Sequence, residues 1–194
     1  VNDNSTEGDL HTTIGGSLAH SGLASNLPLP TLQDVVSLYD MSGGDVIYVD
    51  TGLYPNGGGF VFTPRDYSVL TGVIRIEGST NHPAGGSVLQ DGGFIIRDAR
   101  NVVIRNFSIR GSASAGMFVQ SSTNVLFEGM NVAGAGHGLY MDRTVDVRID
   151  RALITGSRTN GVELFGQNRR AVFDRGVIWT NQLFAVNPVQ SIAI

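Results

Sequence analysis

The sequence predicts an all-β fold in which short strands wind into a solenoid, and three observations carry this prediction. Glycine is abundant, with 26 residues among 194, which favours many tight turns over long helices. The second half of the chain repeats itself every 22 to 24 residues. Within each repeat, apolar or small side chains occupy alternate positions, which is the pattern of strands with one buried face.

The repeat becomes visible when four stretches are aligned. They begin at residues 101, 124, 146 and 170, so successive starts lie 23, 22 and 24 residues apart. They read NVVIRNFSIRG, NVLFEGMNVAG, DVRIDRALITG and RAVFDRGVIWT. The positions predicted to face inward are Val102, Ile104, Phe107, Ile109, Val125, Phe127, Met130, Val132, Val147, Ile149, Ala152, Ile154, Ala171, Phe173, Gly176 and Ile178.

Each repeat also contains a bend and a third strand. The alternation skips one residue after Asn106, Gly129, Arg151 and Arg175, as a tight bend between two strands requires. A third short strand opens each unit after a glycine, at Gly93, Gly116, Gly138 and Gly161. Three strands in about 22 residues leave no room for helical crossovers, and a propeller blade needs about 40 residues. The sequence therefore predicts a right-handed parallel β-helix.

The N-terminal part reads as a cap on this solenoid, within a single domain. Residues 31–44 are predicted to form an amphipathic capping helix and a turn, with Leu32, Val35, Val36, Leu38 and Tyr39 on one face. Residues 1–30 are predicted to be an extended arm that wraps the cap, with partial disorder as the alternative. Residues 45–194 form the β-helix, in which DVIYVDTGLYPNGGG supplies the first strand and a broad turn.

Composition excludes several classes of protein. All 13 basic residues are arginines, none precedes Arg65, and the formal charge is −4, which argues against a nucleic-acid partner. No apolar run approaches 18 residues, so no membrane insertion is expected. Cysteine is absent, which excludes disulfides and cysteine-ligated metals.

A family resemblance adds a context to this fold. The segment SGLASNLPLPTLQDVVSLYDMSGGDVIYVDTGLY, together with the coils that follow it, resembles the N-terminal module of large bacterial secreted proteins with right-handed β-helix repeats, an architecture like that of pectate lyases. The resemblance implies a secreted or cell-surface protein, bacterial in origin, with a structural or adhesive role. The same architecture also includes lyases, hydrolases and epimerases that act on polysaccharides.

The triplet Gly136-His137-Gly138 resembles one that polygalacturonases carry near their catalytic carboxylates. This chain lacks the Asn-Thr-Asp stretch and the adjacent Asp-Asp pair of that family, and Arg148-Ile149-Asp150 replaces its Arg-Ile-Lys. Gly138 also aligns with Gly116 and Gly161, where a turn needs positive φ or close backbone approach. We therefore interpret His137 as a turn residue, with a catalytic role as the alternative.

The outward positions of the opening strands form the main candidate site. By alternation, two columns are predicted, Ile95, Phe118, Tyr140 and Glu163 in one and Arg97, Gln120, Asp142 and Phe165 in the other. Exposed aromatic rings beside charged groups are typical of a sugar-binding surface. Phe118, Tyr140, Asp142, Glu163, Phe165 and Arg97 are therefore candidate ligand-binding residues, and ordinary side-chain ladders are the alternative. Asp142 and Glu163 lie diagonally on adjacent coils, where they could form a carboxylate pair or a cation site.

One metal site stays open. Asp3, Ser5 and Glu7 imitate the first half of a calcium loop, but Ile14 occupies the position of the bidentate glutamate, so the sequence is not an EF-hand. A looser calcium site at these residues is retained, and no other cofactor is expected. The four histidines show no short metal-ligand spacing.

The end of the sequence, QLFAVNPVQSIAI, reads as the start of a further coil without a polar cap. The expected partners are therefore further coils or another copy of the chain, in addition to a polysaccharide. The leading hypothesis is a secreted or cell-surface structural or adhesive module, either a self-assembling filament subunit or part of a giant surface protein. The alternative is an enzyme that acts on an acidic glycan, with Asp142, Glu163 and His137 as its catalytic candidates.

Overall fold

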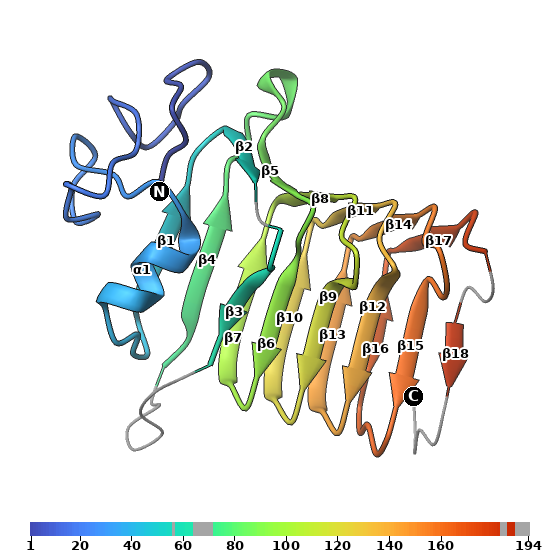
Figure 1. Cartoon of the computed structure of the whole chain (residues 1–194). Helices are drawn as coiled ribbons and strands as arrows, with labels where there is room; N and C mark the ends of the chain where they lie inside the picture. Colours follow the sequence, from blue (N-terminus) through green and yellow to red (C-terminus); the bar gives the residue numbers. More distant parts are fainter. Residues whose placement is uncertain (56, 64–71, 183–185, 189–194) are drawn as a thin grey trace.

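The computed structural model describes residues 1–55, 57–63, 72–182 and 186–188, and it shows a parallel β-helix (Figure 1). The strands form three six-stranded parallel sheets, named A, B and C here. Sheet A contains β1 (Val46–Val49), β4 (Ile74–Gly78), β7 (Arg100–Arg105), β10 (Thr123–Glu128), β13 (Val145–Asp150) and β16 (Val172–Asp174). Sheet B contains β2 (Gly52–Pro55), β5 (Ser87–Gln90), β8 (Phe107–Arg110), β11 (Asn131–Ala133), β14 (Leu153–Thr155) and β17 (Val177–Trp179). Sheet C contains β3 (Phe60–Phe62), β6 (Phe94–Arg97), β9 (Ala115–Gln120), β12 (His137–Asp142), β15 (Val162–Phe165) and β18 (Val186–Pro188).

Each strand from β1 to β15 pairs with the strand three places later in the chain, which confirms the predicted coils of three strands. The predicted inward positions of the first three aligned stretches are all buried. In the fourth, Ala171 is buried and Phe173 and Ile178 are partly buried against the core, whereas Gly176 is exposed, so the prediction is wrong at that position. Phe94 lies in the middle of a phenylalanine cluster, where its ring makes edge-to-face contacts with Phe60 and Phe107 at centroid distances of 5.7 and 5.0 Å.

The predicted bends coincide with left-handed backbone conformations. Asn106, Gly129, Arg151 and Arg175 have φ values of 60°, 63°, 51° and 51°. One left-handed residue between two strands turns the chain sharply and returns the next inward side chain to the core. Asparagine and glycine tolerate this conformation well, whereas the arginines must offset its cost through the packing of the coil.

The β-helix begins with coils that lie before the aligned repeats and that the alignment did not predict strand by strand. The stretch predicted as one strand and a broad turn contains two strands, β1 and β2, and β3 follows it. In β2 only Tyr54 is buried, while Leu53 is exposed, so this strand has a single inward apolar side chain and its alternation is hard to recognise. The 3-10 helix His82–Ala84 leads into β5 of the second coil.

The capping helix is shorter than predicted. α1 (Leu32–Leu38) begins after Thr31, whose side-chain oxygen accepts a hydrogen bond from the N–H of Asp34 at 3.2 Å. Leu32 is buried, and Val35 and Val36 pack against the core. Leu38 is exposed and Tyr39 ends the helix in an extended conformation, so the apolar face stops after one and a half turns.

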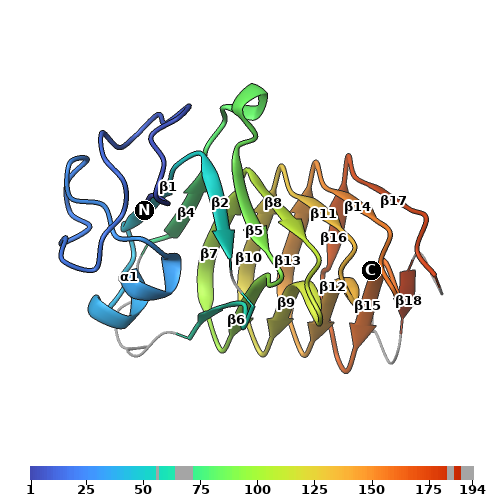
Figure 2. The ribbon, with the colours of Figure 1, turned by 45° about the horizontal axis from the view of Figure 1, so that its top comes forward.

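The arm of residues 1–30 is an ordered, irregular segment that lies beside α1 and β1 (Figure 2). Its main anchor is the buried carboxylate of Asp50, which accepts hydrogen bonds from the N–H groups of Leu10, His11 and Thr12 at 2.6, 2.7 and 2.7 Å. Burial raises the pKa of Asp50, but these backbone donors outweigh it and hold the pKa below its usual value. The predicted wrapping of the cap therefore depends on a charged group at the end of β1.

The predicted further coil at the end of the sequence is described only in part. β18 pairs with β15 in sheet C and continues the β-helix. The final SIAI stretch lies outside the described residues.

Candidate functional site

The two predicted columns exist on the outer face of sheet C, where β6, β9, β12 and β15 run side by side (Figure 1). The strand register pairs Phe118 with Ile95 and with Tyr140, and Tyr140 with Glu163. It also places in one column Arg97, Gln120, Asp142 and Phe165. Parallel strands in register place equivalent side chains directly above one another, so the columns follow from the repeat.

Three aromatic rings form a ladder across the coils. The rings of Phe118 and Tyr140 are parallel within 2°, with centroids 5.2 Å apart, and Phe165 stacks on the other side of Tyr140 at 6.2 Å. The guanidinium carbon of Arg97 lies 5.2 Å from the centre of the Phe118 ring, where a cation–π interaction stabilises it. Phe165 is exposed, and Phe118 and Tyr140 are half-buried. The ladder therefore presents a continuous apolar edge to solvent.

Asp142 is held beside this ladder by two donors. Its Oδ2 atom accepts hydrogen bonds from Gln120 Nε2 and from Arg143 Nη2, both at 2.9 Å. The side chain is almost fully buried. Arg143 compensates the charge, and Gln120, one coil earlier, fixes the orientation of the carboxylate.

His137 and Glu163 form a second polar group. His137 Nδ1 lies 3.1 Å from Glu163 Oε2 and 3.0 Å from the Thr159 hydroxyl oxygen. Since that hydroxyl lies 2.7 Å from the carbonyl of Gly136 and donates its proton to it, it accepts from Nδ1. Asn160 Nδ2 donates to the same carboxylate oxygen of Glu163 at 2.7 Å. Nδ1 of His137 therefore carries a proton, and the proton-accepting nitrogen of the neutral ring is Nε2.

Tyr140 lies close enough to Asp142 and to the His137–Glu163 pair to feel the charges of both carboxylates. Burial, together with the charges of Asp142 and Glu163, raises the pKa of Tyr140 above its usual value. The ring also meets the edge of His137, with centroids 5.8 Å apart. At neutral pH the phenol is therefore protonated and can donate a hydrogen bond to a bound molecule.

The structure brings only some of the predicted residues together. Asp142 and Glu163 lie diagonally on adjacent coils as predicted, but each has its own set of hydrogen-bond donors. Among residues 1–55, 57–63, 72–182 and 186–188, no group of three or more His, Asp or Glu side chains is placed to hold a metal ion. The arrangement of the two carboxylates therefore favours fixed hydrogen-bond acceptors over a cation site.

His137 is not the turn residue that was predicted, whereas close backbone approach, one of the two reasons expected for the glycine, is confirmed. His137 is the first residue of β12, and its side chain belongs to the site. A Cβ atom on Gly138 would lie 2.1 Å from Ile154 Cγ2, and one on Gly136 would lie 2.5 Å from the Ser114 carbonyl. The glycines are thus required by close approach between coils, not by positive φ, and the histidine between them points outward.

Sequence reasoning missed Thr159, Asn160 and Arg143. The first two precede Gly161, which aligns with Gly138, so the repeat places Asn160 one coil beyond His137. That alignment was the signal that could have found them. Arg143 follows Asp142 at a left-handed corner, with a φ of 53°, and nothing in the repeat pattern distinguishes it.

Asp3 and Ser5, two of the residues predicted to bind calcium, accept hydrogen bonds from backbone N–H groups. Asp3 accepts from the N–H of Ser5 at 2.7 Å and from the N–H of Leu53 in β2 at 2.9 Å. The hydroxyl of Ser5 accepts from the N–H of Glu7 at 3.0 Å. These contacts give Asp3 a structural role in fastening the arm to the first coil.

Comparison with known proteins identifies one family. Residues 74–191 match the family model described as the right handed beta helix region, which spans more than half of the chain. The searches of curated proteins and of solved structures gave no match. Within the described part of the chain, no helix has the length and apolar character that a membrane span requires.

Proposed function

The chain belongs to the right-handed β-helix family, and on this premise we propose that it is a secreted or cell-surface adhesive module that binds a polysaccharide. The binding surface is the outer face of sheet C. The observation that carries the proposal is the ladder of Phe118, Tyr140 and Phe165, with charged groups on both sides. The fold alone is compatible with many functions, whereas this surface carries the kinds of groups that bind sugars.

The ladder suits the two kinds of contact that sugars make. The C–H faces of a pyranose ring pack on aromatic rings, while its hydroxyl groups need fixed donors and acceptors. Here the acceptors are the carboxylates of Asp142 and Glu163, and the donors are the Tyr140 phenol and the Arg97 guanidinium. Because the rings follow one another from coil to coil, a bound glycan chain would run along the axis of the β-helix.

Binding is favoured over cleavage because the carboxylates are held by neighbouring side chains. Glycosidic hydrolysis by two carboxylates needs one as a proton donor and the other as a base or nucleophile. Asp142 is neutralised by Arg143, and Glu163 is engaged by His137 and Asn160. These partners donate hydrogen bonds to the carboxylate oxygens, so both groups are held in place as hydrogen-bond acceptors.

A polysaccharide lyase, hydrolase or epimerase is the second candidate, and the pair of His137 and Glu163 favours it. A carboxylate that fixes the tautomer of a histidine leaves Nε2 ready to remove a proton, and the Tyr140 phenol beside it could donate one. An acidic glycan, whose uronate has an acidic C–H, would be the substrate class. This candidate predicts reaction products, whereas adhesion predicts none.

Affinity electrophoresis in gels that contain pectin, alginate or a neutral glycan tests the proposal. We expect one of these polymers to retard the protein, and we expect Tyr140→Ala and Phe118→Ala to abolish the retardation. Trp179→Ala is the matched control, because Trp179 is an exposed aromatic residue on sheet B. Unchanged retardation of Tyr140→Ala would remove the ladder from the proposal. New reducing ends or unsaturated uronate absorbance, lost in His137→Gln, would favour the enzyme instead.

We also propose that the module stacks on further coils or on another copy of itself, as a filament subunit does. Its parallel sheets support this, since a further strand on β16 or β17 would extend an existing ladder of backbone hydrogen bonds. Sedimentation velocity over a range of concentrations tests the self-assembly. A single monomeric species at all concentrations would contradict it.

A further inference from the structure

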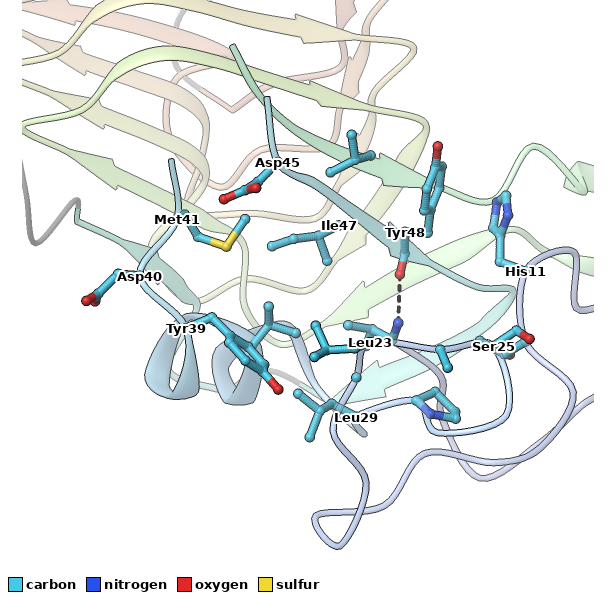
Figure 3. Close-up of a pocket in the computed structure, with 17 residues that line it drawn as sticks. His11, Leu23, Ser25, Leu29, Tyr39, Asp40, Met41, Asp45, Ile47 and Tyr48 are labelled. Atoms are coloured by element: carbon cyan, nitrogen blue, oxygen red, sulfur yellow. Dashed lines mark hydrogen bonds between the residues drawn. The ribbon is translucent and has the colours of Figure 1, made fainter. Parts of the chain in front are cut away.

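A cavity of about 430 Å³ lies between β1, α1 and the arm (Figure 3), and none of its lining residues belongs to the aromatic ladder on sheet C. Its apolar surface includes the buried residues Leu29 and Ile47, together with Met41. Tyr48 lies at one end, with its ring 4.6 Å from that of His11. A cavity of this size is large enough for a ligand or a peptide segment.

One side of the cavity is the edge of a sheet. β1 is the outermost strand of sheet A and pairs with β4 alone among the strands that the structure describes. On its other edge, the carbonyl of Tyr48 accepts a hydrogen bond from the nitrogen of Val1 at 2.7 Å, and the N–H of Asp50 donates to the carbonyl of Val1 at 2.9 Å. These two bonds are the pattern of a parallel bridge.

The cavity continues along the same edge of β1. Since backbone groups alternate sides along a strand, the N–H and C=O of Val46 face the same edge as those of Tyr48. Val46, Ile47 and Tyr48 all line the cavity. The cavity is therefore a slot beside a strand edge that already accepts one parallel residue, and such edges recruit further strands.

The negative charge of the slot indicates which side chains a bound peptide would carry. Asp40 and Asp45 lie at the end opposite Tyr48 and His11 (Figure 3). Among the residues that the structure describes, no lysine or arginine lines the cavity, and the sequence contains none before Arg65. A positively charged side chain at this end would be attracted by both carboxylates, whereas a negatively charged one would be repelled.

We propose that this slot binds an extended peptide strand of a partner protein, parallel to β1, in which apolar side chains alternate with basic ones. Backbone hydrogen bonds to Val46 and to the N–H of Tyr48, whose carbonyl already accepts from Val1, provide part of the affinity, as in other cases of strand addition. The apolar side chains contact the floor at Leu29 and Ile47, and a basic side chain lies near Asp45. This site is independent of the proposed polysaccharide surface.

The test uses a capped hexapeptide of alternating valine and lysine with a fluorescent label. Two N-methylated forms of it carry the methyl groups on the valine amides or on the lysine amides. Because only alternate N–H groups of a strand face β1, we expect one form to bind roughly tenfold more weakly and the other to bind almost as well as the parent. Fluorescence anisotropy measures the affinity, and the amide signals of residues 46–48 should shift in NMR spectra.

Two variants and a control complete the test. Ala24→Trp, at an exposed position of the arm that lines the slot, should block binding, and Asp45→Asn should weaken it roughly threefold at low salt. Glu163→Gln on sheet C should bind as the wild type does. Equal affinity for both methylated forms, no binding of the parent peptide, or equal binding of a valine–glutamate peptide would overturn the proposal.

Discussion

The solenoid and the arm are held by different kinds of interaction. In the solenoid, each inward side chain stacks on its counterparts in the coils before and after it, as Ile104 does on Ile76 and Phe127. In the arm, several leucines are exposed, including Leu18 and Leu23, and polar contacts to the first coil replace an apolar core.

This difference shows how stability is distributed along the chain. The apolar columns stabilise the solenoid through contacts between neighbouring coils. The loss of one side chain should therefore destabilise mainly the adjacent coils. The arm depends on a few carboxylates, above all Asp50, whose removal leaves backbone N–H groups without an acceptor. Changes to the two regions should therefore differ in size, in location and in their response to pH and salt.

The largest effect is expected from Phe94→Ala. The Phe94 ring contacts Phe60, Phe107 and Phe127 and is fully buried, so its removal leaves a cavity in the centre of the cluster. We expect a loss of about 3–5 kcal/mol in the free energy of unfolding, measured by urea denaturation. Leu153→Ala, at an exposed position of sheet B, is the control and should change stability by less than about 0.5 kcal/mol. Similar losses for both variants would contradict a solenoid held by its inward columns.

A smaller and more local effect is expected from Asp50→Asn. The amide retains one acceptor oxygen but loses the charge that strengthens the bonds from Leu10, His11 and Thr12. Opening of the arm should become easier by about 1.5–3 kcal/mol, seen as faster hydrogen exchange at these three amides. Exchange in β9 and β12 should stay as in the wild type. Equal loss of protection in the arm and in these strands would show that the arm and the solenoid unfold together.

The same contact predicts how the arm responds to acid. The pKa of Asp50 is lower in the folded protein than the value of about 3.9 for a free aspartate. Its contribution is therefore fully present above that ordinary value and is lost as the pH falls through the lowered folded pKa. The amide signals of residues 10–12 should thus shift only in strong acid, and Asp50→Asn should lack this transition. A transition of the wild type near pH 6 would point to another group instead, such as the α-amino group of Val1, whose pKa burial lowers to about 6.

Much of the solenoid was predictable because its physics repeats. Alternation predicted which side chains face inward, and the skipped residues at Asn106 and Gly129 predicted tight bends, which the structure shows to be left-handed corners. The first coils were recognised less well, since β2 offers only Tyr54 as an inward apolar residue. The arm has no repeat, and its attachment to Asp50 depends on residues almost forty positions apart, which local pattern cannot reveal.

The part of the candidate site that lies on the repeated strands was predictable from the sequence, and the part that lies on corners and loops was not. Register placed Phe118, Tyr140 and Glu163 in one column, because equivalent positions of parallel coils coincide. The partners of the charged groups come from corners and loops, where neighbouring repeats differ in sequence. His137 was therefore interpreted as a turn residue, although in the structure its ring contacts Glu163.

The smallest effect is expected on the outer face of the solenoid, where Arg105 lies between Glu77 and Glu128 at 3.5 and 2.6 Å. These side chains are partly exposed, so water and salt screen their attraction and the cost of ordering the arginine offsets part of the gain. We expect Arg105→Gln to lower the free energy of unfolding by about 0.2–1 kcal/mol at low salt, and we expect the difference to fade near 1 M salt. Urea denaturation at two salt concentrations measures both values. A loss that matched Phe94→Ala and persisted in salt would mean that the charged outer ladder, and not the apolar interior, holds adjacent coils together.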